Sequence, residues 1–143
     1  MSSKGVGLLH FIDGIVNAEK CIKILEENLI PPVPNLADCG EYVFQHDGAS
    51  SHTAKSTTKW LQENGIEVLD WTSFSPDLNP IENLWALMKR KLRNNPQRTL
   101  SGLKAQIQEI WNSITPEECK NLISTMPKRM EAVLKSKGDV TKF

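Results

Sequence analysis

The sequence predicts an α/β fold, with a core of short strands alternating with helices and a helical C-terminal part. Two observations predict it. Three short apolar runs alternate with two segments whose apolar residues recur at helical spacing, and the chain beyond residue 94 has helical patterns only. A hydrophobic content of 39% in 143 residues suits one domain with a modest core. We therefore expect a single domain over residues 1–143, with its core at 7–94 and a helical part at 95–143.

The first half of the chain supplies the alternating elements. The predicted strands are the apolar runs at residues 7–12, 42–46 and 66–71. A helix is expected from its N-cap Asn17 to the residues before Pro31, because apolar residues fall on one face in between. A second helix is expected over residues 51–64, where Gly65 provides a left-handed stop.

Local sequence also marks where the later helices begin. Asn79 is a predicted N-cap, with Pro80 at the first helical position and Glu82 three residues after the cap. Further helices are expected to begin at Thr99 and at Thr115, where the sequence fits a capping box. The residues that predict a last helix are Met130, Val133 and Leu134.

The overall charge is balanced, with 17 basic and 17 acidic side chains, and therefore argues neither for nor against nucleic-acid binding. The distribution is more informative, because no acidic residue lies between Asn83 and Gln108. A basic face is expected there, either as a nucleic-acid contact or as an ordinary solvated helix surface. The candidate nucleic-acid-binding residues are Lys89, Arg90, Arg93, Arg98 and Lys104, with Lys91 beside them.

The cysteines and the apolar segments limit the class of protein. Cys21, Cys39 and Cys119 are scattered without a CxxC pair, which fits a reducing compartment better than a disulfide framework. The N-terminus has no apolar signal-peptide core, and no window has the length of a membrane-spanning helix. We therefore expect an intracellular protein with no membrane partner.

Two acidic residues are candidates for a metal site. Asp47 directly follows the second predicted strand, and ligands of open α/β sheets collect at the carboxyl ends of strands. Glu82 lies near a helix N-terminus, from which its carboxylate could face the same crevice. Two converging carboxylates would offer oxygen ligands to Mg²⁺ or Mn²⁺ and support two-metal phosphoryl transfer.

Each candidate also has an alternative interpretation. The turn after Asp47 is a common way to end a strand, and Glu82 suits a capping or helix-dipole role. His46 and His52 flank Asp47 as in a zinc site, but no supporting ligand pattern accompanies them. The serines before His52 suggest a hydrolase, but the sequence has no GxSxG elbow.

Two motifs resemble segments of mariner-type DNA transposases. The stretch FQHDGA at residues 44–49, followed by HTAK, is similar to the family segment that carries the second catalytic aspartate. The stretch WTSFSPDLNPIENLW at residues 71–85 resembles the family's third-carboxylate motif. The 34 residues between Asp47 and Glu82 match the spacing of the family's Asp-Asp-Glu triad. Because residues 7–29 also look like the family, the resemblance covers nearly the whole chain.

The resemblance implies a ribonuclease-H-like fold that cuts and rejoins transposon ends with two Mg²⁺ or Mn²⁺ ions held by three carboxylates. By position, Asp47 is the second carboxylate and Glu82 the third. The first is expected on an opening strand upstream of Gly5, so the resemblance implies an N-terminally truncated fold; Asp13 matches a non-catalytic turn position. The family's N-terminal helix-turn-helix DNA-binding region is also expected to be missing, and the family location is nuclear.

Three classes of function follow. The leading one is a transposase-derived domain for DNA strand cleavage and transfer, inactive alone because two carboxylates hold a metal weakly. The second is a non-enzymatic remnant that binds DNA or a partner through the basic face. The third, an unrelated hydrolase or structural domain, conflicts with the motif at residues 71–85. Without opening strands, residues 42–46 would form an exposed apolar sheet edge, which predicts marginal stability and pairing with a second copy or a partner chain.

Overall fold

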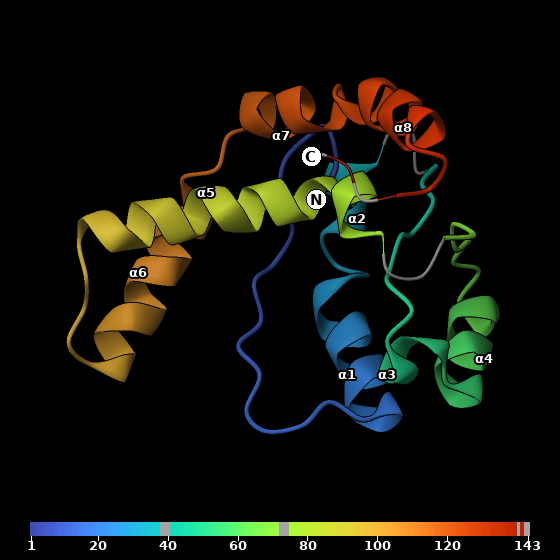
Figure 1. Cartoon of the computed structure of the whole chain (residues 1–143). Coiled ribbons are helices and arrows are strands. Elements are labelled where there is room, and N and C mark those ends of the chain that lie inside the picture. The colour runs from blue at the N-terminus through green and yellow to red at the C-terminus, as the bar shows by residue number, and fades with distance from the viewer. Residues whose placement is uncertain (38–40, 72–74, 140, 142–143) are drawn as a thin grey trace. The chain divides into compact units, whose positions relative to one another are not determined.

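The structure, a computed structural model, describes residues 1–37, 41–71, 75–139 and 141 (Figure 1). The chain forms two compact units, one of Gly7–Phe74 and one that joins Met1–Val6 to Ser75–Phe143. The predicted division between residues 94 and 95 stays a prediction. Cys39 and the first part of the expected loop at residues 72–79 lie outside the described residues.

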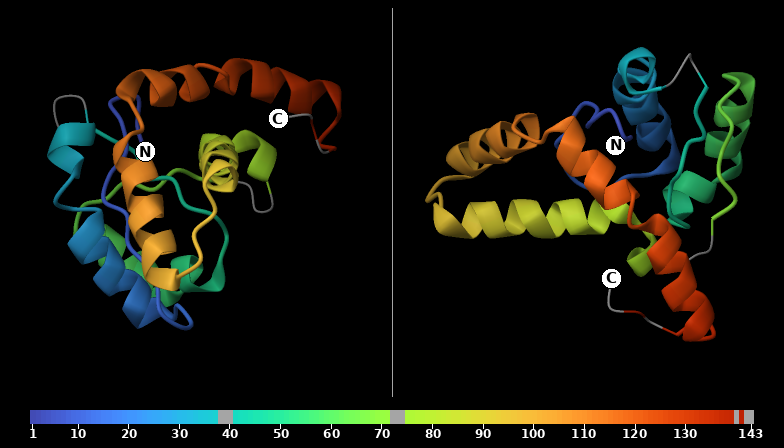
Figure 2. Two further views of the ribbon diagram at one scale, coloured as in Figure 1. Left: turned by 90° about the vertical axis from the view of Figure 1, so that its left-hand side faces the viewer. Right: turned by 90° about the horizontal axis from the view of Figure 1, so that it is seen from above.

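The described part of the Gly7–Phe74 unit contains the helices α1 (Ala18–Asn28), α2 (Val33–Leu36), α3 (Ser50–Thr53) and α4 (Lys55–Glu63). The predicted start of α1 is confirmed, because Oδ1 of Asn17 accepts a hydrogen bond from the backbone N–H of Lys20 at 2.9 Å. α1 packs against α3 and α4 (Figures 1 and 2). Cys21, Thr57 and Leu61 are buried in this unit, each with 4% or less of its surface exposed.

The single helix predicted over residues 51–64 is wrong at one point. Ala54 is extended, with φ −58° and ψ 141°, and separates α3 from α4. The hydroxyl of Thr57 donates to the backbone carbonyl of Ser51 at 2.7 Å, and this bond competes with a continuous helical ladder. Gly65, at φ +65°, ends the second piece as predicted.

The three predicted strands are wrong as regular elements of the described structure. Residues 7–12 pair with no strand there, and the other two runs meet at one parallel bridge between Phe44 and Val68. The N–H of Phe44 donates to the carbonyl of Glu67 at 2.8 Å, and the N–H of Leu69 donates to the carbonyl of Phe44 at 2.9 Å. A single bridge among the described residues makes only a marginal sheet, so the predicted apolar sheet edge at residues 42–46 stays a prediction.

The second unit is helical in its described part. It contains the 3₁₀ turn η1 (Pro76–Leu78) and the helices α5 (Pro80–Asn94), α6 (Leu100–Asn112), α7 (Pro116–Ile123) and α8 (Met126–Lys135). The predicted N-caps of α5, α6 and α7 are confirmed, since each side-chain oxygen accepts a backbone N–H of its helix; they are Asn79, Thr99 and Thr115. Figure 1 shows α6 turning back toward α5 after the connecting loop.

The core of this unit lies between α5, α6 and α7. Leu84 and Cys119 are fully buried, and Trp85 stacks on Trp111 with 5.4 Å between ring centroids. α8 is a helix as predicted, but Leu134 is 77% exposed. In the part of the chain that the structure describes, no helix is both long and apolar enough to span a bilayer.

Candidate functional site

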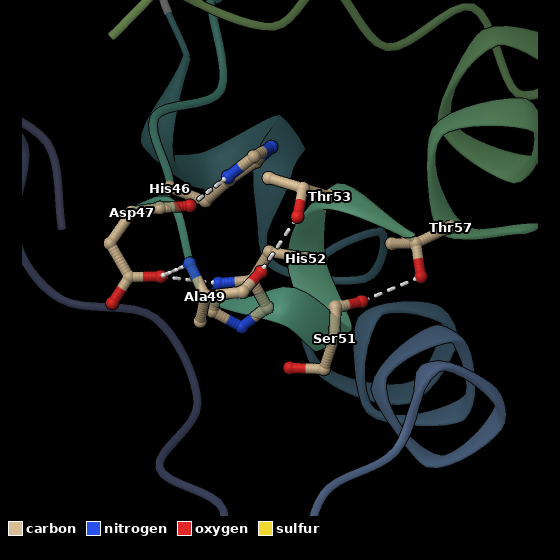
Figure 3. A network of polar contacts seen from close by, with 7 residues as sticks. All are labelled: His46, Asp47, Ala49, Ser51, His52, Thr53 and Thr57. Carbon is tan, nitrogen blue, oxygen red and sulfur yellow. Dashed lines mark hydrogen bonds and ion pairs between the residues drawn. The ribbon is translucent and has the colours of Figure 1, made fainter. Parts of the chain in front are cut away.

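Asp47 lies just after the bridged residue Phe44 and is oriented by the start of α3. Its Oδ1 accepts a hydrogen bond from the backbone N–H of Ala49 at 3.0 Å (Figure 3). The same oxygen lies 2.7 Å from Nδ1 of His52, which must carry the proton because an ionised carboxylate only accepts. The turn at Ala49 brings His52 back toward Asp47, so a short local segment builds this arrangement.

The charge of Asp47 is stabilised by these neighbours. Its partial burial raises the pKa, but the hydrogen bonds from Ala49 and His52 and the charges of His52 and His46 together hold the pKa of Asp47 below its ordinary value. The His46 ring lies 5.5 Å from the His52 ring, edge to face. Asp47 is therefore ionised at neutral pH, with 65% of its side chain exposed.

Glu82 lies in the first turn of α5 and is exposed. Its backbone N–H donates to the carbonyl of Asn79 at 3.1 Å, and the Asn79 side chain caps the N–H of Ile81 at 3.3 Å. Among the described residues its carboxylate makes no hydrogen bond back to the cap, so the alternative capping-box role is not formed. The partial positive charge of the helix N-terminus attracts a negatively charged group at this position.

Both carboxylates fit a hard divalent cation by their chemistry. The two described hydrogen bonds of Asp47 use Oδ1, which leaves Oδ2 for a cation, and Glu82 offers an exposed carboxylate. Asp47 belongs to the Gly7–Phe74 unit and Glu82 to the other. Their assignment as a shared site stays a prediction.

The alternative chemistries do not form. Among the described residues, no group of three histidine, cysteine, aspartate or glutamate side chains could hold a metal ion, so the zinc site around His46, Asp47 and His52 is absent. The described hydrogen bonds do not join His52 to a serine hydroxyl, since its Nδ1 contacts Asp47 instead. The alternative of a serine hydrolase therefore lacks its nucleophile–base pair.

The predicted basic residues lie on α5, α6 and the loop between them. Lys89, Arg90, Arg93 and Arg98 are exposed, whereas Lys104 and Lys91 are partly buried. A groove of about 490 Å³ lies between the end of α5 and α6, and of these basic residues only Lys91 lines it. Its other polar lining includes Asn95, Gln97, Gln106 and the acidic Glu109.

Sequence reasoning missed Arg129. It is 2% exposed and lies on the inner face of α8, where Met126 and Val133 continue the same helical stripe. Burial lowers the pKa of its guanidinium, and the charge of Asp77 partly offsets this. A basic residue at an inward position of an amphipathic helix was the signal that could have identified it.

The family model described as a DDE superfamily endonuclease matches residues 1–104. The chain belongs to this family. The Tcb2 transposase of Caenorhabditis briggsae is 33% identical over 135 residues, which are 94% of this chain and 49% of that protein. The Tc3 transposase of Caenorhabditis elegans is 36% identical over 133 residues, which are 92% of this chain and 40% of that protein. These relatives confirm the Tc1/mariner-type resemblance.

A solved structure of the Mos1 transposase catalytic domain, with raltegravir and Mg, matches this DDE-family chain with a TM-score of 0.85 and 25% identity. The match covers 98% of this chain and 73% of that chain. The likeness agrees with the predicted ribonuclease-H-like class, although the described residues form helices and isolated bridges. The chain spans about half the length of the curated relatives it matches.

Proposed function

We propose that this chain contributes to the DNA strand cleavage and transfer of cut-and-paste transposition, with Asp47 and Glu82 as metal-binding carboxylates. The observation that carries the proposal is the state of these two side chains. Each is exposed, Glu82 lies in the first turn of α5, and hydrogen bonds from Ala49 and His52 help to hold the pKa of Asp47 below its ordinary value. Membership of the DDE endonuclease family, whose model matches residues 1–104, supports the proposal.

The two carboxylates would hold Mg²⁺ or Mn²⁺, since Mos1 has been solved with each of these ions. When bound, the ions supply an activated attacking oxygen and stabilise the leaving oxygen. The chain's own part is to orient the ligands: Ala49 and His52 fix Oδ1 of Asp47, so that Oδ2 faces outward. Glu82 lies in the first turn of α5, where the partial positive charge of the helix N-terminus favours a nearby negative charge.

DNA is the proposed partner, because Mos1 has been solved in a paired-end complex with a transposon end. The basic residues named above would contact phosphates, which gives binding that weakens steeply with salt. Action on transposon DNA would place the protein in the nucleus.

We further propose that the 143 residues alone cleave DNA poorly. Two carboxylates position a phosphate less well than three, and among the described residues no group of three histidine, cysteine, aspartate or glutamate side chains could hold a metal ion. A segment or a second copy that brings another carboxylate would then restore activity.

The test is Mg²⁺- or Mn²⁺-dependent cleavage of a transposon-end duplex by the chain, by Glu82→Gln and by Glu117→Gln. Glu117 is a matched control, because it is also exposed in the first turn of a helix. Cleavage that Glu82→Gln abolishes and Glu117→Gln keeps would establish the role of Glu82 and overturn inactivity of the chain alone. If neither the chain nor its variants cleave, Mn²⁺-induced broadening of the Asp47 and Glu82 NMR signals tests metal binding directly. Absence of broadening at both residues would overturn the metal site.

A second candidate function is a non-enzymatic module that binds DNA or a partner through the basic residues. Their exposure on α5 and the following loop favours it. DNA binding with a steep salt dependence that persists in Asp47→Ala, without any Mn²⁺ effect, would support this candidate over the enzyme.

A further inference from the structure

Arg129 links α8 to the segment that carries Glu82. Its Nη1 donates to the backbone carbonyl of Asp77 at 2.7 Å, and its Nη2 donates to Oδ1 of Asn83 at 2.6 Å. Its Nε donates to the hydroxyl of Thr125 at 2.8 Å. A buried guanidinium is stable only when its donors are paired, so the positions of these acceptors are tightly specified.

Asp77 ties the same turn to the C-terminal segment. Its Oδ2 accepts hydrogen bonds from the backbone N–H of Thr141 at 3.2 Å and from the Thr141 hydroxyl at 2.9 Å. Within the turn, the N–H of Asn79 donates to the carbonyl of Pro76 at 3.0 Å. The residue that caps α5 therefore follows a turn held from two distant parts of the chain.

We propose that Arg129 is a positioning residue for Glu82. Its two contacts with this segment lie on either side of Glu82: Asp77 precedes the cap of α5, and Asn83 directly follows Glu82. Holding both fixes the rotation of the first turn of α5 and with it the direction of the exposed Glu82 side chain. The functional meaning of this position rests on the proposed role of Glu82 as a metal ligand.

A purely structural role for Arg129 makes a different prediction. If Arg129 only stabilised the unit as a whole, its loss would reduce the hydrogen-exchange protection of all helices of the unit by a similar factor. If Arg129 positions Glu82, the loss of hydrogen-exchange protection should be largest at η1 and in the first turn of α5. Thr115→Ala is the matched comparison, because Thr115 caps α7 in the same unit without a described contact to Asp77, Asn83 or Glu82.

The experiment measures residue-by-residue amide hydrogen exchange in the full 143-residue chain and in Arg129→Lys, Asn83→Ala and Thr115→Ala. Lysine keeps the charge but lacks the planar fork of donors with which Arg129 reaches Asp77 and Asn83. Asn83→Ala removes one acceptor of the guanidinium and leaves Arg129 and its other two described acceptors in place. The second readout is Mn²⁺-induced broadening of the Glu82 amide in the same samples. Asn83→Ala keeps the test valid if Arg129→Lys fails to fold.

In Arg129→Lys and Asn83→Ala, we expect the Asn79 and Glu82 amides to lose about tenfold more exchange protection than the α6 amides. In Thr115→Ala, we expect the Asn79, Glu82 and α6 amides to lose protection equally. Equal loss across the unit in all variants would overturn the inference. Mn²⁺ broadening at Glu82 should weaken in the first two variants and persist in the third. Absence of Mn²⁺ broadening in the unmodified chain would refute only the proposed metal role of Glu82. The hydrogen-exchange result would still decide whether Arg129 holds this turn.

Discussion

The two candidate metal carboxylates are held over different distances along the chain. Asp47 is oriented by Ala49 and His52, which lie within five positions of it. The segment around Glu82 is held by Arg129, which lies 52 positions from Asp77 and 46 from Asn83. The first arrangement is a property of local sequence, whereas the second exists only when α8 is folded onto η1 and α5. Mutations should therefore affect the two carboxylates unequally.

The largest effect is expected from Arg129→Met. It leaves the Asp77 carbonyl and the Asn83 side chain without their buried donor, so the free energy of unfolding should fall by about 2–4 kcal/mol. Urea denaturation followed by tryptophan fluorescence measures this, because Trp85 and Trp111 stack in the same unit. Lys128→Met is the control at an exposed neighbouring position, expected within about 0.5 kcal/mol of the unmodified chain. An equally small change for both variants would contradict the comparison.

The same distinction explains what could be predicted from the sequence. N-caps depend on residues two or three positions apart, and those at Asn17, Asn79, Thr99 and Thr115 were all predicted. The strands could not be predicted reliably, because a strand exists only through a partner elsewhere in the chain, and here Phe44 finds a single bridge.

For the candidate site, the resemblance of two motifs to a known family identified Asp47 and Glu82. The sequence did not show which residues contact and orient these two carboxylates. His52 was noted beside Asp47, but its hydrogen bond depends on the turn that ends at Ala54. Arg129 was missed because a charged residue is expected at the surface, and its burial follows from two acceptors far away in sequence.

A smaller effect is expected at Asp47. Asp47→Ala removes the acceptor of the Ala49 N–H and should cost about 1 kcal/mol, whereas Asp47→Asn keeps an oxygen there and should cost less. Exchange of the Ala49 amide measures this directly. Arg129→Met should leave that amide unchanged, because Asp47 is held by its own neighbours. A loss of Ala49 protection in Arg129→Met as large as in Asp47→Ala would show that the two arrangements are coupled.

The smallest effect is expected at Glu118, which closes the capping box of α7. The N–H of Thr115 donates to its carboxylate at 2.8 Å and lowers the pKa of Glu118; slight burial opposes this, and the Thr115 hydroxyl and Lys91 charge lower the pKa further. The unfolded chain therefore binds the proton more readily. The stabilisation is complete above the ordinary glutamate pKa of about 4.3 and is lost as pH falls through the lowered value.

Glu118→Gln should remove this pH dependence and reduce the free energy of unfolding at neutral pH by less than about 1 kcal/mol. The measurement is the difference in unfolding free energy between the unmodified chain and Glu118→Gln from about pH 3 to 7. Glu117→Gln is the control, exposed one position earlier. A difference that grows as pH falls would have the wrong sign for a carboxylate of lowered pKa. A difference that shrinks toward low pH would confirm the sign, and a loss at neutral pH smaller than that of Arg129→Met would show that this contact over three residues contributes less than the long-range contacts of Arg129.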